Sequence, residues 1–193
     1  MFALTSWAAS TNESFAGVGE VRAAVWTILP SENSSDTRFS IDCSGFSAVP
    51  VEGGYSLRIP GQVSSEARTP DVPRLAKLFP GVKRARAVLT VEGSDPTNIA
   101  CTVAAAEGYR LDDPESPNRK LRPYRQPDPE IYANDRFWPS DLGRLAQATI
   151  GTQKVVRVEC FPVQYDPITR EVRFYRRLEG FLRFEPIENI SSP

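Results

Sequence analysis

Residues 155–174 read VVRVECFPVQYDPITREVRF, and this stretch decides the class of fold. Its first part, residues 155–159, is rich in β-branched side chains, which is typical of strands. Its last part opens a second run, residues 172–184, in which apolar side chains alternate unevenly with arginines, as in strands with one solvated face. Between the two runs, residues 162–169 contain Asp166 followed by Pro167, a pair that favours a turn. The stretch therefore predicts a β-hairpin.

The composition of the whole chain agrees with a β-rich fold. Its 193 residues suit a single domain spanning residues 1–193. The 17 Pro and 12 Gly, together with 10 Phe, 6 Tyr and 3 Trp, favour many short strands and turns over helices. We expect an all-β fold, a jelly-roll-like β-sandwich.

Further strand candidates are β-branched or alternating runs that stop at Pro, Gly or polar residues. They are residues 20–29, 39–49, 55–59, 84–91 and 98–106. Residues 74–78 lie between Pro73 and Pro80, so they predict either one helical turn or an extended link.

Residues 109–139 predict a long, Pro-rich, charged loop. Prolines recur along it, its centre is basic and its flanks are acidic. Pro disfavours pairing in a sheet, and ordering so long a loop costs conformational entropy, so a functional role is one reading. The other reading is a solvated insertion whose charges neutralise one another.

Several functions are excluded or disfavoured by composition. The sequence contains no His, which removes the Cys-His and Ser-His-Asp arrangements of hydrolases, so we expect no enzyme. A net charge of -1 provides no overall electrostatic attraction to nucleic acid. No apolar run reaches the ~18 residues of a membrane span. Residues 1–10 lack the basic region and the long apolar region of a secretory signal, and we read them as a trimmed start.

Cys43, Cys101 and Cys160 are widely spaced, and no Cys-x-x-Cys pair accompanies them. Without His they do not form a recognisable zinc site, so we expect no metal and no cofactor. They read as small buried apolar residues with one disulfide at most, and the sequence leaves the pairing open.

A resemblance to a known family rests on two groups of motifs. Phe137-Trp138-Pro139, then Val155-Val156-Arg157-Val158, Pro162-Val163-Gln164-Tyr165-Asp166-Pro167 and Val172-Arg173-Phe174-Tyr175 follow one another along the chain. This order resembles the end of the N-terminal prodomain of gingipain-type cysteine peptidases. Upstream, Thr69-Pro70-Asp71-Val72-Pro73-Arg74-Leu75 is similar to that family's Gly-x-Pro-x-Leu-Pro element, although Thr69 replaces Gly and Val72 replaces Leu.

The resemblance implies a non-catalytic β-sandwich that covers a cognate gingipain-like catalytic domain, keeps it latent and assists its folding. It also implies a loop that enters the active-site cleft of a peptidase that prefers Arg or Lys before the scissile bond. Arg122 is the first candidate for that position, because Pro123 would oppose cleavage after it. Arg119, Lys120 and Arg125 are the alternatives, and Tyr124 lies among them. A secreted, periplasmic or cell-surface location follows from the same resemblance.

A second hypothesis is a stand-alone β-sandwich module that binds or assembles an extracellular or cell-surface complex. Tyr124, Tyr132, Phe137 and Trp138 could supply its contacts, because aromatic side chains bury a large area at a small entropy cost. The two hypotheses differ in what accompanies the chain. A prodomain requires a catalytic domain that contains His and Cys, whereas a binding module does not.

Overall fold

The computed structural model of the chain describes residues 21–31, 36–111 and 120–187. Within these ranges the elements are antiparallel strands and one short helix, so the expected all-β fold is confirmed. The interpretation of residues 1–10 and the candidate Arg119 lie outside the described ranges.

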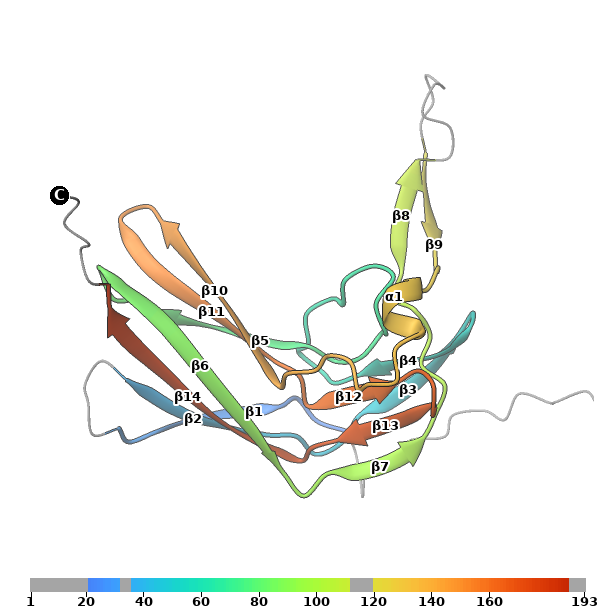
Figure 1. Cartoon of the computed structure of the whole chain (residues 1–193), viewed down its shortest axis with the longest axis horizontal. Coiled ribbons are helices and arrows are strands. Elements are labelled where there is room, and N and C mark those ends of the chain that lie inside the picture. The colour runs from blue at the N-terminus through green and yellow to red at the C-terminus, as the bar shows by residue number, and fades with distance from the viewer. Residues whose placement is uncertain (1–20, 32–35, 112–119, 188–193) are drawn as a thin grey trace, which may run out of the picture.

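Two antiparallel sheets pack face to face and form the body of the molecule (Figure 1). The four-stranded sheet has the order β1 (Val25–Leu29), β2 (Thr37–Asp42), β14 (Arg177–Pro186), β6 (Ala85–Ser94). The three-stranded sheet has the order β10 (Gly143–Ile150), β11 (Gln153–Cys160), β5 (Leu75–Pro80).

Aromatic side chains join the two sheets. The ring of Phe39 on β2 stacks on that of Phe79 on β5, with centroids 5.6 Å apart, and Trp26 on β1 lies 5.3 Å from Phe39. Val156 and Val158 of β11 are buried in the same core. Burial of this apolar surface is the main driving force for packing the sheets together.

Smaller sheets extend this sandwich at one end. One has the order β12 (Val163–Asp166), β13 (Glu171–Phe174), β7 (Thr97–Ala100). The pair β3 (Ser47–Val51) and β4 (Gly54–Arg58) and the pair β8 (Gly108–Leu111) and β9 (Leu121–Tyr124) are hairpin-like ribbons. The short helix α1 (Pro129–Tyr132) follows β9.

The structure contains the predicted hairpin turn, but the first strand of the hairpin is not the one predicted. Residues 155–159 belong to β11, which pairs with β10 and β5 and not with residues 172–184. The hairpin is formed by β12 and β13, and Asp166 Oδ1 accepts hydrogen bonds from the backbone N–H groups of Ile168 and Thr169 at 2.9 and 3.2 Å. The turn chemistry was read correctly. The pairing was wrong because the chain changes sheet at Pro162, which precedes a fully buried strand.

Other predicted bounds also change. Residues 39–49 divide between β2 and β3, and Pro50 lies within β3 opposite Tyr55. Residues 74–78 are not a helical turn, because β5 pairs with β11 along its whole length. Strand β10 was not predicted, since residues 143–150 are mostly exposed and carry little apolar pattern.

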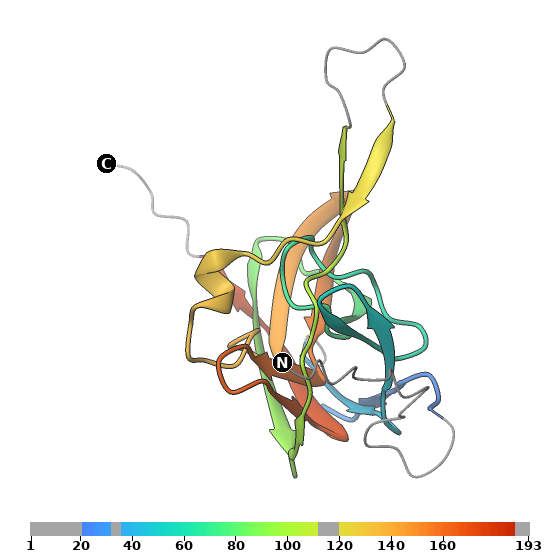
Figure 2. The same ribbon diagram turned by 90° about the vertical axis from the view of Figure 1, so that its right-hand side faces the viewer.

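Residues 109–139 are not one long loop. They contain the end of β8, the whole of β9 and helix α1, with residues 112–119 outside the description. Pro123 was expected to oppose pairing, but it lies in β9 opposite Tyr109. Each strand of a two-stranded ribbon is an edge strand, and edge strands accommodate Pro. The ribbon projects from the body in both views (Figures 1 and 2).

Candidate functional site

The projecting ribbon of β8 and β9 carries a basic face. Its register places Arg110 opposite Arg122 and Gly108 opposite Tyr124. Directly opposed residues share one face of an antiparallel pair. The Arg110 guanidinium carbon lies 5.7 Å from the centroid of the Tyr124 ring, which is a cation–π geometry. This face therefore presents two guanidinium groups beside an aromatic ring.

The other face of the ribbon is apolar and exposed. It carries Tyr109, which is 62% exposed, and Leu121, which is 66% exposed. Leu111 and Pro123 are also exposed on this face. The four residues are neighbours on this face, so they present one continuous apolar strip to solvent. The ribbon is thus two-faced, and both faces are suited to contact with another molecule.

Arg125 fixes the base of the ribbon to the body. Its Nη1 donates a hydrogen bond of 2.7 Å to the carbonyl of Ala105 and lies 3.2 Å from Asp71 Oδ2. Its Nη2 lies 3.8 Å from Glu107 Oε2. The Arg125 side chain is only 14% exposed, so its charge is directed into the molecule and not outwards.

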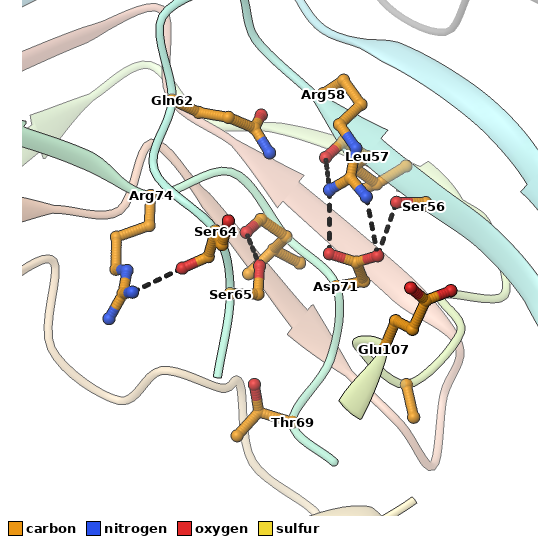
Figure 3. A network of polar contacts seen from close by, with 12 residues as sticks. Ser56, Leu57, Arg58, Gln62, Ser64, Ser65, Thr69, Asp71, Arg74 and Glu107 are labelled. Atoms are coloured by element: carbon orange, nitrogen blue, oxygen red, sulfur yellow. Dashed lines mark hydrogen bonds and ion pairs between the residues drawn. The ribbon is translucent and has the colours of Figure 1, made fainter. Parts of the chain in front are cut away.

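Asp71 is the centre of the polar network at this base (Figure 3). The Ser56 hydroxyl donates to Asp71 Oδ2 at 2.6 Å, and Arg58 donates to the two carboxylate oxygens at 2.8 and 3.0 Å. Burial raises the pKa of Asp71, but the hydrogen bonds from Arg58 and Ser56 outweigh it and hold the pKa below its ordinary value. The carboxylate is therefore charged and fully paired at neutral pH.

The upstream motif, residues 69–75, supports the strand that leads into the ribbon. The backbone N–H of Ala106 donates to the carbonyl of Thr69 at 2.7 Å, and that of Asp71 donates to the carbonyl of Ala104 at 2.9 Å. Thr69 and Asp71 are both buried. The motif that carries the resemblance therefore lies directly beneath the candidate site.

The downstream motif fixes the chain where it returns to the body. Trp138 and Tyr165 exchange two backbone hydrogen bonds, of 2.8 and 2.9 Å. Gln164 Nε2 donates to the carbonyl of Pro139 at 2.7 Å, and the Arg173 guanidinium stacks 3.8 Å from the centroid of the Phe137 ring. Both ends of the segment that carries the ribbon are thus held by buried or half-buried contacts.

A groove of about 630 Å³ lies between the ribbon base and the start of β10. It is crossed by ion pairs: Arg144 Nη2 lies 2.7 Å from Glu159 Oε2 and 2.5 Å from Glu66 Oε1, and Arg74 Nη1 lies 3.1 Å from Glu66 Oε1. The hydrogen bond from Arg144 is the main cause that lowers the pKa of Glu66. Arg144, Arg74 and Glu66 are consequently paired within this groove.

The candidates from the sequence occupy different environments. Arg122 and Lys120 are exposed on or beside β9, whereas Tyr124 and Arg125 are half-buried at the base. Arg110, Tyr109 and the rest of β8 were not singled out, although the alternation Tyr109-Arg110-Leu111 was a signal for a strand opposite β9.

The described residues contain neither a cluster suited to a metal ion nor a helix suited to crossing a membrane. Across residues 21–31, 36–111 and 120–187, no group of three or more His, Cys, Asp or Glu side chains is placed to hold a metal ion. Over the same ranges, no helix has both the length and the apolar character needed to span a membrane.

Comparison with known families gives a match to a class of propeptides. The chain belongs to the Propeptide_C25 family, whose model matches residues 21–189. This result confirms the resemblance to the propeptides of gingipain-type cysteine peptidases that the motifs indicated. A search of curated proteins gave no match.

Solved structures share the fold. A chain in the complex of Porphyromonas gingivalis RgpB pro- and mature domains is 20% identical, with a TM-score of 0.63 over 86% of this chain and 84% of that chain. A chain from a study of the zymogenic latency of gingipain K from Porphyromonas gingivalis is 18% identical, with a TM-score of 0.69 over 91% of this chain and 99% of that chain. At such identities the likeness is one of fold.

Proposed function

We propose that residues 1–193 are one non-catalytic propeptide domain of a gingipain-like cysteine peptidase, which keeps the catalytic domain latent and assists its folding. The family match over residues 21–189 is the observation that carries this proposal. The similar structures support it, because one is a complex of pro- and mature domains and the other concerns zymogenic latency. The same function implies a secreted, periplasmic or cell-surface location.

The two-faced ribbon is the part of this domain that would enter the active-site cleft. Arg122 would occupy a pocket that accepts a cation, where its planar guanidinium can pair with a buried carboxylate. Pro123 follows it, and its ring would hinder cleavage at that bond. Lys120 and Arg119 are the alternative occupants, with Tyr124 against the pocket wall. Because Arg125 fixes the ribbon base, less conformational entropy is lost on docking.

The chain itself would contribute no nucleophile. Its sequence has no His to activate a thiol. Burial raises the pKa of Cys101 to about 11 and that of Cys43 and Cys160 to about 12, and only a thiolate is an effective nucleophile. The partner would therefore supply all the catalytic groups, and the propeptide would act only by binding.

Peptide mapping and intact mass of the protein from its native source test this function. We expect the chain to be joined to, or to copurify with, a longer segment that contains His and Cys. That segment, purified separately, should hydrolyse peptides after Arg or Lys, and the chain should inhibit it. Isolation of the chain without any such segment would contradict the proposal.

The alternative is a binding or assembly module of an extracellular or cell-surface complex. The exposed apolar face of the ribbon is the observation that favours it, because Tyr109 and Leu121 would suit a protein contact of any kind. Copurification with proteins that lack a Cys-His pair would support this alternative.

A further inference from the structure

The ribbon of β8 and β9 leaves the body at its first pair of opposed residues, Gly108 and Tyr124. Gly108 is buried and Tyr124 is half-buried. Opposed residues share one face of an antiparallel pair, so the tyrosine ring lies over the place where a side chain of residue 108 would stand. A Cβ added to Gly108 would lie 2.8 Å from both Cε1 and Cζ of this ring. The ring therefore fills the space that the glycine leaves open.

The body contributes a second group at the same point. The added Cβ would also lie 2.9 Å from the Cβ of Ala67, whereas ordinary carbon–carbon contacts are about 3.5–4.0 Å. Ala67 precedes a residue that is bonded on both sides: the Arg68 N–H donates to the carbonyl of Ala106 at 3.2 Å, and the Asp128 N–H donates to the carbonyl of Arg68 at 2.9 Å. The arrangement of Gly108, Tyr124 and Ala67 is called the ring seat here.

The ring seat requires glycine for space and not for its backbone conformation. The φ of Gly108 lies outside the left-handed region, in contrast to that of Gly53 or Gly61. An alanine could adopt the same backbone, but its methyl group would overlap both neighbours. The tyrosine ring can turn away about its side-chain torsions, whereas Ala67 has no such torsion. A methyl group at position 108 therefore pushes the backbone of the ribbon and that of the body apart.

The ring seat is also linked to the opposed pair that carries Arg122. The Arg110 guanidinium carbon lies 5.7 Å from the centroid of the Tyr124 ring, and Arg110 lies directly opposite Arg122. Each described strand of the ribbon has four residues, which span about 13 Å. A small rotation at the first pair consequently moves the far end of the ribbon more than its base. The direction in which the ribbon projects (Figures 1 and 2) thus depends on the ring seat.

We propose that Gly108 is a positioning residue for latency: by seating the Tyr124 ring against the body, it sets the direction of the ribbon and hence the place of Arg122 in the cleft. This inference rests on the proposed function and adds to it the feature that aims the ribbon. Functional contacts need a geometry held to about 0.5 Å, and rigid presentation lowers the entropy lost on docking. The ring seat acts in the free chain, before any partner binds.

Gly108→Ala tests the proposal, and Gly93→Ala is its matched control. Gly93 lies in β6, within the body, and a Cβ added there would overlap the ring of Tyr175, so both variants press a methyl group against a tyrosine ring. The probe is the separately purified catalytic domain of the chain's own precursor, and the inhibition constant is measured with a peptide substrate. We expect Gly108→Ala to inhibit at least tenfold more weakly than the unaltered chain, and folded Gly93→Ala to inhibit within twofold of it.

A second substitution should restore inhibition. Ala67→Gly removes the methyl group that the new side chain meets, and the tyrosine ring can move into the vacated space. The double variant Ala67→Gly/Gly108→Ala thus transfers one methyl group across the contact and conserves the total volume. We expect it to inhibit within threefold of the unaltered chain. If it folds and is as weak an inhibitor as Gly108→Ala, the ring seat is not the cause and the inference is wrong.

Residual dipolar couplings of the free chain measure the direction of the ribbon. In the unaltered chain and in the double variant, the amide couplings of β8 and β9 should fit the same orientation relative to β14. In Gly108→Ala they should depart from it. Weak inhibition by Gly108→Ala with unchanged couplings would mean that a lost contact, and not the direction of the ribbon, is responsible, and this result would overturn the inference.

These measurements separate the inference from the proposed function. If Gly108→Ala inhibits as well as the unaltered chain, the positioning role is refuted and the proposed function stands. If the unaltered chain does not inhibit at all, both fail. Should Gly108→Ala fail to fold, as judged by circular dichroism, Tyr124→Ala empties the ring seat from the opposite strand. Unchanged couplings of β8 and β9 in that variant would refute the inference.

Discussion

Asp71 shows how one carboxylate can hold a projecting element in place. It is 3% exposed and receives hydrogen bonds from Ser56 and Arg58 of β4 and from Arg125, which directly follows β9. Removing one partner of a buried charge network leaves the others unpaired in a poorly solvated site, which is far costlier than losing a surface pair.

Asp71→Ala should lower the free energy of unfolding by about 3 kcal/mol, because it leaves Arg58 and Arg125 without their shared carboxylate. Urea denaturation followed by circular dichroism measures the change. Glu185→Ala is the control, since its pair with Arg183 is exposed and should be worth less than about 1 kcal/mol. Equal losses in the two variants would show that the network does not stabilise the fold.

The same residue predicts acid sensitivity. The pKa of Asp71 is lowered in the folded state, so its stabilisation is complete above the unfolded pKa of about 4 and is lost as the pH falls through the folded value. Stability should therefore decline between about pH 5 and pH 2. Asp71→Asn should flatten this part of the stability curve, measured as the urea midpoint at each pH. An identical slope in both proteins would exclude Asp71 as its source.

Arg122 and Arg125 should separate binding from stability. Arg125→Ala should lower the unfolding free energy by about 2 kcal/mol, because Arg125 is half-buried and bonded to Asp71 and Ala105. Arg122→Ala, at an exposed position, should change it by less than about 0.5 kcal/mol. Inhibition of the catalytic domain should show the reverse order, with Arg122→Ala the weaker inhibitor. An unchanged inhibition constant for Arg122→Ala would count against the pocket model.

At the scale of the element, the main sheet depends on a glycine at its centre. Gly180 lies in β14 between β2 and β6, and a Cβ added there would overlap the ring of Phe39, which is fully buried. The side chain of Phe39 fills the space that any larger residue at position 180 would need. Interiors are close-packed, so neither group can move away freely.

Gly180→Ala should destabilise the domain by about 1–3 kcal/mol through overpacking against Phe39. The melting temperature by calorimetry measures this effect. Glu179→Ala provides a control in the same strand, since its side chain is exposed, and should stay within about 0.5 kcal/mol of the unaltered chain. A stable Gly180→Ala variant would mean that the Phe39 ring can repack.

Local patterns predicted the strands better than their partners. The β-branched run in β11 and the Asp-Pro turn before β13 were readable because propensity and turn chemistry are local. The change of sheet at Pro162 was not, because pairing over long separations depends on the packing of the whole core. Strand β10 was not predicted because most of its residues are exposed, so its sequence lacks the alternation of apolar and polar residues that marks a half-buried strand.

The sequence predicted the position of the candidate site better than its conformation. Basic residues next to Pro123 pointed to the right segment, yet the segment was expected as a loop and is largely a ribbon. The anchoring contacts of Arg125 could not be read from the sequence, since Asp71 lies 54 residues away along the chain. Only the folded backbone brings the upstream motif to the base of the ribbon and the downstream motif to the point where the chain returns to the body.

At the scale of the whole molecule, the three thiols should report global unfolding. Cys43, Cys101 and Cys160 are buried and unpaired, and burial raises the pKa of each. Ellman's reagent at about pH 8 should therefore react with none of them within minutes in the native protein, and with all three in denaturant. Rapid reaction of one thiol in the native state would reveal local opening around it.

Strand β14 is the last described strand in the sequence, yet it lies in the interior of the main sheet, between β2 and β6. On the ribosome, β2 is therefore made long before the strand that pairs with it: at about 5–20 residues per second, the delay is on the order of ten seconds. Until β14 emerges, β2 and β6 each keep an unpaired edge. The nascent chain thus passes through a partly folded, aggregation-prone stage. Chaperones that bind unpaired strand edges would act mainly during that interval.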